Sequence, residues 1–384
     1  MKTIDKQENK SLRKIQLLLF SLGCIVVLLM MNNSYPIFNK KSGNLIRHNV
    51  LCLIITLCLV YIVAMSAYKT IKQHKNCDVL TVIHYNARNF MNVEILRFML
   101  VMYVILEHFG LYLIGVLGSD YQQLFDRFHF EGRSQLFFVI AGFFLFYNDK
   151  QLKLPTSFFV LKRWFRLSGL VIFTTIILYV MTHFDIKKFP LENNILNCCL
   201  MNWITDSDNN LVSAAWYVNL LFLLSICFFV VFKYLNKKTS LLITFFAIVV
   251  SSNFYARGVG FGDGFIWSRM PGAIFSLCVG ILMAEIYKNK KTENNEINTK
   301  KAIIITVLEL ISFSSLFIGL YCNGFGINLG NNILSADIAI LLWLFINNKG
   351  SLSKMLNKHF AVYFGKYVYS IYITHVINMW IWEG

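Results

Sequence analysis

The sequence predicts an all-α fold, a polytopic transmembrane helical bundle with about 11 spanning helices. Hydrophobic residues make up 57% of the 384 residues and charged residues only 15%, whereas soluble domains average about 25% charged residues. The mean hydropathy is +0.57. Most apolar runs have about 17 to 25 residues, which is the length that a helix needs to cross a bilayer. The chain is therefore expected to be an integral membrane protein.

The candidate spans are apolar runs separated by polar or basic segments. The first run follows a basic N-terminus and resembles a signal peptide, but no small-residue cleavage site follows it, so we interpret it as an uncleaved anchor. The fourth and tenth runs are the shortest. In chain order the predicted spans are 15–31, 50–68, 93–117, 134–148, 167–183, 213–232, 240–256, 270–287, 302–321, 333–347 and 361–382.

Lys and Arg in the connecting segments predict the orientation. With the N-terminus in the cytoplasm, the inside segments carry 25 Lys and Arg and the outside segments carry 9. Basic loops stay on the cytoplasmic side, so the asymmetry predicts a multi-pass membrane protein with a cytoplasmic N-terminus. Frequent Asn, Lys and Ile are typical of AT-rich bacterial genomes, which favours the cytoplasmic membrane of a bacterial cell as the location.

Charge and cysteine usage exclude several classes of function. The formal net charge of +16 is explained by the basic loops, and no RNA- or DNA-binding motif is present, so we expect no nucleic-acid partner. The nine Cys include no C-x-x-C pair. We therefore expect neither a metal site nor a disulfide framework, and no permanently bound cofactor.

A polar segment at residues 69–92 predicts two parts of the chain. Residues 1–89 form an accessory N-terminal transmembrane hairpin with a polar linker, and residues 90–384 form the main membrane domain. The inside loops of that domain are too short for a soluble catalytic domain. Any chemistry must therefore take place within the membrane part.

Arg97 and His108 are the first candidate site residues. They are 11 positions apart, so at ~100° per residue they share one helix face, about 16 Å apart along the axis. Ionisable groups within an apolar span are costly and mark a functional site or an interior polar pair. Glu107 is adjacent to His108 but is rotated by ~100° from it.

Arg163 and Arg166 are predicted at the cytoplasmic entrance of the 167–183 span. Their i, i+3 spacing places both guanidinium groups on one side, which suits phosphate groups; ordinary anchoring at the membrane surface is the alternative. Ala141 and Gly142 permit close approach of a neighbouring helix or a ligand. Helix–helix packing is the simpler interpretation.

Three further groups of residues are candidates, the first two near the outer side. Trp216 and Tyr217 begin a span, where aromatic belt residues are common, and Arg269 begins another, where it could hold an anionic or polyhydroxylated group or lie at the interface. Tyr372 and His375, at i and i+3 in the last span, form a second intramembrane polar pair. A hydrogen-bonded structural His is the alternative there.

Taken in order, these pieces resemble the acyltransferase-3 family of integral membrane O-acyltransferases over residues 90–384. The family pattern in its first helix is a basic residue, ten other residues and then a His, and Arg97 and His108 match it. The family's Phe-Phe-x-x-Ser-Gly-Phe segment is matched by 137–143, with Ala141 in place of the Ser, and its Trp-Tyr-Leu segment by 216–218. Its Arg-x-x-Arg is matched by 163–166, without the Pro that often follows soon after. Its Ser-Tyr-x-x-Tyr-Leu-x-His segment is approximated by 369–375, where the Ser-Tyr order is inverted.

The resemblance implies transfer of an acyl group, usually acetyl, from cytoplasmic acyl-CoA to a hydroxyl of a cell-envelope or capsular polysaccharide or its lipid-linked precursor. Arg163 and Arg166 would bind the acyl-CoA. Arg97, Glu107 and His108 would be the catalytic group, with His108 as general base or acyl carrier. Five residues would line the pocket or bind the acceptor: Trp216, Tyr217, Arg269, Tyr372 and His375.

The chain also departs from the family pattern. Family cores resemble ten-helix bundles with one more helix after the last motif, whereas only nine residues follow His375. A polysaccharide transporter or polymerase without CoA chemistry is the alternative function, because such proteins also combine many helices with intramembrane Arg.

Overall fold

The computed structural model describes residues 90–117, 133–147, 149–183, 185, 188–206, 209–258, 260–262, 264, 266–290, 299–322, 330–357 and 360–383. These residues form helices joined by turns, with no strand among them. The predicted accessory hairpin, with spans 15–31 and 50–68, lies outside the described residues.

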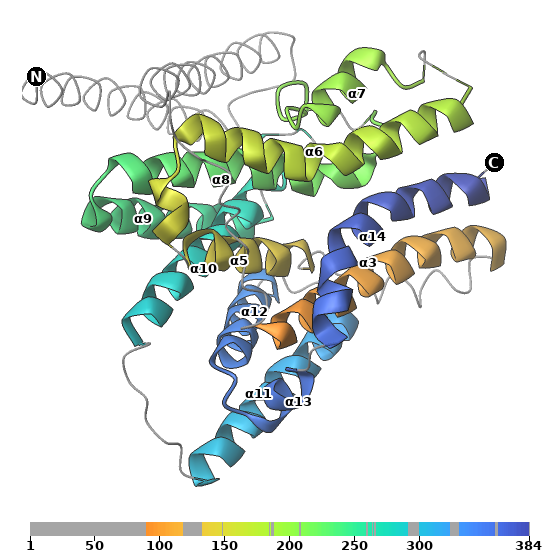
Figure 1. Ribbon diagram of the computed structural model, residues 1–384. Helices are drawn as coiled ribbons and strands as arrows, with labels where there is room; N and C mark the ends of the chain where they lie inside the picture. The colour runs from red at the N-terminus through yellow and green to blue at the C-terminus, as the bar shows by residue number, and fades with distance from the viewer. Residues whose placement is uncertain are drawn as a thin grey trace, which may run out of the picture.

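The long helices are α3 (Met91–Leu117), α5 (Arg133–Phe146), α6 (Thr156–Met181), α8 (Trp216–Tyr234), α9 (Lys237–Ala256), α10 (Met270–Lys290), α11 (Thr299–Cys322), α12 (Gly330–Asn347) and α14 (Phe360–Glu383). Each overlaps one of the nine spans predicted beyond residue 90 (Figure 1). Three shorter elements lie in predicted connections, namely η3 (Asp149–Lys153), α7 (Leu191–Cys198) and α13 (Ser351–Leu356). A fourth, η4 (Ser213–Ala215), occupies the start of the predicted span 213–232 and leads directly into α8.

Part of this set has the length and composition of membrane-spanning helices. Among the described residues, four segments are both long and apolar enough to cross a bilayer, at 156–181, 213–234, 237–256 and 270–289. Shorter apolar helical stretches occur at 134–146, 336–347 and 367–377. The described part of the chain is thus all-helical, with helices able to cross a membrane, and the total of about 11 spans is a prediction from the sequence.

Proline and asparagine mark the starts of several helices. Pro155 and Pro190 immediately precede α6 and α7, and Pro271 lies in the first turn of α10, where a missing N–H costs no helical hydrogen bond. Asn236 caps α9, because its side chain accepts a hydrogen bond from the Thr239 N–H at 2.8 Å.

One predicted boundary is wrong. The charge pattern predicts a cytoplasmic loop up to residue 166 and a span from 167, but α6 begins at Thr156, directly after Pro155. The turn at 156–161 is apolar enough to pack, and the basic residues that follow lie on the helix itself. Arg163 and Arg166 therefore project from the second and third turns of α6.

Helices α5 and α10 pack closely against each other. A Cβ at Gly142 would strike the backbone carbonyl of Leu277, and a Cβ at Gly280 would strike that of Val139. On each helix, a glycine thus packs directly against the backbone of the other helix, as small residues do at membrane helix interfaces. The packing reading of Gly142 is supported by this contact.

We expect Gly142→Ala to lower the melting temperature of the detergent-solubilised protein by several degrees, because the added methyl group forces α5 and α10 apart. Gly169→Ala is the matched control, since a Cβ there meets nothing within 4 Å. In a helix interior, alanine is more favourable than glycine by about 1 kcal/mol. Thermal unfolding of both variants checks the contact; equal melting temperatures would contradict it.

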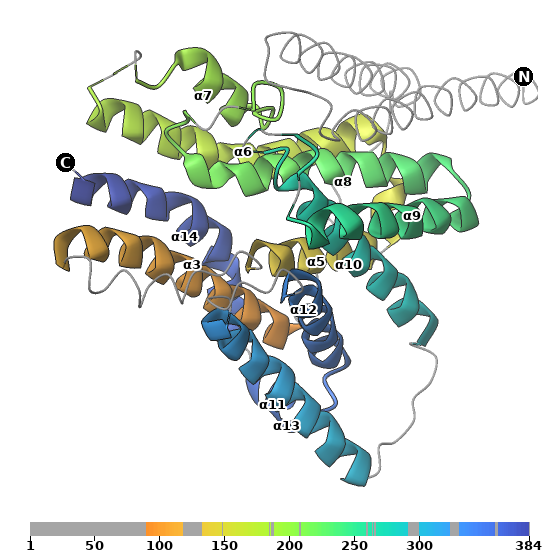
Figure 2. The ribbon, with the colours of Figure 1, turned by 180° about the vertical axis from the view of Figure 1, so that it is seen from behind.

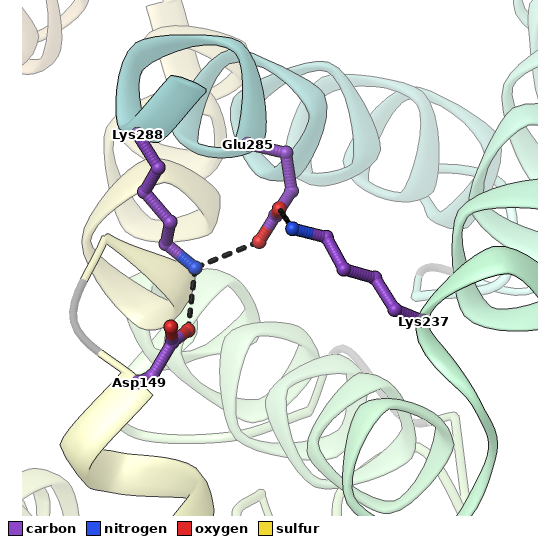
Figure 3. A network of polar contacts seen from close by, with 4 residues as sticks. All are labelled: Asp149, Lys237, Glu285 and Lys288. Atoms are coloured by element: carbon purple, nitrogen blue, oxygen red, sulfur yellow. Dashed lines mark hydrogen bonds and ion pairs between the residues drawn. The ribbon is translucent and has the colours of Figure 1, made fainter. Parts of the chain in front are cut away.

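Segments predicted on the same side of the membrane meet in the structure. At one end, Lys288 contacts Asp149 at 2.5 Å and Glu285 at 2.7 Å, and Lys237 contacts Glu285 at 2.6 Å (Figure 3). These residues join η3, the start of α9 and the end of α10, which are all predicted to be cytoplasmic.

At the other end, the predicted outer segments are held by buried amides. The Asn219 side chain donates to Asn197 at 2.8 Å and accepts from the Asn202 N–H at 2.9 Å. The Ile266 N–H donates to Asp206 at 2.5 Å, which ties the α9–α10 connection to the segment before α8. Buried polar groups with partners of this kind hold an irregular segment in one conformation.

Helices α3 and α14 lie side by side in both views (Figures 1 and 2). Near their starts, Gly365 packs against the side chain of Glu94. Farther along both helices, His108 meets His375. The two helices therefore run in the same direction, as expected for spans that enter from the same side.

Candidate active site

A cavity of about 660 Å³ lies between α3, α5, η3, α6, α8 and α14. Its wall extends from Lys150 and Gln151 in η3 to a cluster of aromatic rings formed by Phe137, Tyr217 and Tyr372. The middle of the wall is largely apolar and includes Ala141 and Leu167. Such a space suits a long ligand that is anionic at one end and thin and uncharged along its length.

Five basic side chains line this cavity, from Arg97, Lys150, Lys162, Arg163 and Arg166. No carboxylate is among the described residues of its wall. A concave site lined by one sign of charge concentrates ligands of the opposite sign. The composition of the cavity wall therefore favours anionic ligands.

Arg163 is the more buried of the two Arg residues that α6 contributes to the cavity wall. Its guanidinium lies over the ring of Phe159, 5.9 Å from the centroid. Its Nε is buried and has no acceptor among the residues that the structure describes, whereas Arg166 is exposed. A buried guanidinium N–H without an acceptor is costly, and an anionic ligand in the cavity would supply one.

Arg97 has a partner that the sequence analysis missed. The Glu94 carboxylate accepts from Arg97 Nη1 at 2.9 and 3.1 Å. Glu94 is buried, and the absence of a side chain at Gly365 makes room for it. The signal that could have found it is the i, i+3 spacing of an acid and a base within one apolar span.

His108 and His375 form the second polar centre. His108 Nδ1 lies 3.1 Å from His375 Nε2, and the Nδ1–H of His375 donates to the carbonyl oxygen of Tyr372. Tyr372 also lines the cavity. On α3 the cavity wall ends at Val101, seven residues or about 10 Å before His108, so the pair lies just beyond the aromatic end of the cavity.

The tyrosines of that end are held by backbone carbonyls. Tyr372 OH donates to Ala214 O at 3.0 Å, and Tyr369 OH donates to Leu167 O. Tyr369 was not among the predicted site residues, although it lies in the same 369–375 segment, one turn before Tyr372. These bonds tie α14 to α6 and η4, so the rings keep one orientation toward the cavity.

The predicted site residues thus fall into separate groups. Arg97, Arg163, Arg166, Tyr217 and Tyr372 line one cavity, and His108 and His375 meet beyond it.

Two of the remaining predicted residues form their own contact, and one is not described. Trp216 and Arg269 do not line the cavity; the Arg269 guanidinium lies 5.3 Å from the centre of the Trp216 ring. The side chain of Glu107 lies outside the described part of the structure. Among the described residues, no group of three or more His, Cys, Asp or Glu is placed to hold a metal ion.

The ion-pair network of Figure 3 positions one edge of the cavity. Asp149 belongs to η3, whose Lys150 and Gln151 line the wall, and it is held by Lys288. Lys288 is held in turn by Glu285, which is nearly buried. From the other side, Lys233 Nζ donates to the carbonyl oxygen of Leu154. The short turn between α5 and α6 is therefore fixed on two sides.

Comparison with known proteins identifies the family of the chain. The family model described as an acyltransferase domain, that of the acyltransferase-3 family, matches residues 90–384, about three quarters of the chain. Neither among curated proteins nor among solved structures is there a significant match. The matched range contains the basic cavity, the Arg97–Glu94 pair and the His108–His375 pair. The chain belongs to the acyltransferase-3 family of membrane acyltransferases.

Proposed function

We propose that this membrane acyltransferase moves an acyl group, in the simplest case acetyl, from acyl-CoA to a hydroxyl of a cell-envelope or capsular polysaccharide or its lipid-linked precursor. The observation that carries the proposal is the cavity between α3, α6 and α14, which has five basic side chains and an apolar, aromatic wall. We place the protein in the bacterial cytoplasmic membrane, with its N-terminus and the η3 edge of the cavity on the cytoplasmic side.

The chemistry of acyl-CoA fits this cavity. Its nucleotide end carries phosphate groups, which guanidinium forks bind through paired, charge-assisted hydrogen bonds. In the proposal, Arg163 and Arg166 hold these phosphates, with Lys150 and Lys162 at the entrance. The uncharged pantetheine arm then follows the apolar wall past Arg97, and its thioester end reaches the aromatic cluster at Tyr217 and Tyr372.

His108 is the proposed general base. Imidazole is the side chain whose ordinary pKa lies nearest neutral pH, so it can take the proton of a hydroxyl and return it within one turnover. The His pair lies beyond the end of the cavity where the thioester would arrive. Trp216 and Arg269, stacked near the outer end of the bundle, are proposed to contact the acceptor on its way to this point.

Transfer from isotopically labelled acetyl-CoA tests the proposal. The full chain is reconstituted in lipid vesicles with a membrane extract containing lipid-linked glycans, and label in the glycan is measured. We expect labelling that depends on both the protein and acetyl-CoA, together with one added acetyl mass per modified repeat in surface glycans of cells that carry the protein. If glycan levels depend on the protein but no acetyl group is transferred, a transporter or polymerase is the better description.

A further inference from the structure

The contact between His108 and His375 joins two residues that are 267 positions apart in the chain. The nitrogen–nitrogen distance of 3.1 Å is that of a hydrogen bond. The ring centroids are 5.0 Å apart and the rings are tilted by 55°, so the contact is edge-on through the nitrogens. His375 is 3% exposed, and its ring is therefore held in place by packing as well as by hydrogen bonds.

The carbonyl oxygen of Tyr372 determines which ring nitrogens of His375 and His108 carry a hydrogen. That oxygen can only accept, so Nδ1 of His375 must carry a hydrogen. A neutral imidazole has one N–H, and Nε2 of His375 is then an acceptor. His108 Nδ1 lies against this acceptor and must supply the hydrogen. In His108 the lone pair is consequently on Nε2.

We infer that His375 is a positioning residue that holds His108 in its Nδ1–H tautomer, so that His108 Nε2 takes the proton of the acceptor hydroxyl. The inference rests on the proposed function, in which His108 is the general base. It gives the His of the last helix a role distinct from lining a pocket. The role resembles that of the carboxylate that orients a catalytic histidine in hydrolases, with a neutral ring in its place.

The transfer step balances with this assignment. The acceptor oxygen forms a bond to the acyl carbon as its proton moves to His108 Nε2, and the bond between that carbon and the CoA sulfur breaks. The proton then passes from His108 Nε2 to the CoA thiolate. An alcohol and an acyl thioester thus become an ester and a free thiol, and both histidines return to their starting tautomers.

His375 also acts while His108 is protonated. The imidazolium of His108 keeps its Nδ1–H directed at His375 Nε2, so the positive charge has an acceptor within the protein. Without that acceptor, a donor would be left unpaired in a site from which much of the solvent is excluded. Loss of a partner for such a group corresponds to about a 10- to 100-fold loss in rate.

The kinetic test compares two variants of the reconstituted full chain. His375→Phe keeps a ring but removes the acceptor nitrogen, whereas His375→Gln places an amide oxygen near the position of Nε2. We expect kcat of His375→Phe to fall about 10- to 100-fold with the KM for acetyl-CoA unchanged, because the basic cavity is intact. His375→Gln should recover most of the lost kcat.

Nitrogen-15 NMR of histidine-labelled protein gives a second readout that does not require activity. The His108 signals, identified by their loss in His108→Ala, should show a protonated Nδ1 and an unprotonated Nε2. In His375→Phe we expect the pattern to shift toward the Nε2–H form. Protein that fails to fold is recognised by size-exclusion chromatography before either measurement.

Three results would overturn the inference: wild-type kcat in His375→Phe, equal losses in the Phe and Gln variants, or an Nε2–H form of His108 in the wild type. A wild-type protein that transfers no acetyl group would instead refute the proposed function, and the NMR measurement would still decide whether His375 sets the tautomer.

Discussion

Replacement of His108 by alanine should lower kcat for acyl transfer by about 10²- to 10⁴-fold, the range that a general base contributes. The KM for acetyl-CoA should change little, because His108 lies beyond the end of the basic cavity that would bind the donor. The loss should be larger than that of His375→Phe, since His375 acts only through His108. Transfer of labelled acetyl groups in vesicles measures both constants.

His183→Asn is the control for this variant. His183 is exposed on the turn after α6, does not line the cavity, and has a positive φ of 50°, a conformation that Asn tolerates better than most residues. Its activity should equal that of the wild type. Folding of His108→Ala is checked by its melting temperature in detergent. A well-folded His108→Ala protein with wild-type kcat would exclude His108 as the base.

Replacement of Arg163 by alanine should raise the KM for acetyl-CoA by about 10- to 100-fold, because a hydrogen bond to a charged group contributes about 1.5–3 kcal/mol. The structure places its Nε in a buried position without an acceptor among the described residues. Arg163→Lys should recover only part of this loss, since an ammonium group cannot form the paired bonds of a guanidinium. Initial rates over a range of acetyl-CoA concentrations measure the effect.

Two controls separate binding by Arg163 from general charge. Lys238 is exposed at the start of α9, at the same end of the bundle as the cavity entrance, so Lys238→Ala removes a positive charge without touching the cavity. Its KM should stay near the wild-type value. Arg166→Ala should have a smaller effect than Arg163→Ala, because Arg166 is exposed and more screened by water. Equal effects of all three substitutions would indicate nonspecific attraction.

Much of the fold could be predicted because a membrane helix is recognisable from its own sequence, as a long run of apolar residues. A run of apolar residues long enough to cross a bilayer has few other structures available, since every backbone polar group must be paired within the segment. Each of the nine predicted spans after residue 90 therefore overlaps a helix. The boundary of α6 was missed because Arg163 and Arg166 resemble loop residues by charge alone.

The candidate site could be predicted only in part. Arg97 and His108 stand out because they are ionisable residues in an apolar run, and Arg163 and Arg166 stand out by their spacing. Glu94 is the partner of Arg97 but was not predicted as a site residue, because an acid in the first turn of a helix is common. Trp216 and Arg269 were expected with the pocket, but they pair with each other outside the cavity.

The sequence by itself determined the helices and their family, since both depend on short-range patterns of hydrophobicity, proline and spaced polar residues. Only the tertiary structure decided which polar residues meet. The approach of His375 to His108, and of α6 to α14 around the cavity, depends on how helices far apart in the chain pack together. Such packing is decided by side-chain shape and by glycines such as Gly142 and Gly365 at close contacts, which no local pattern specifies.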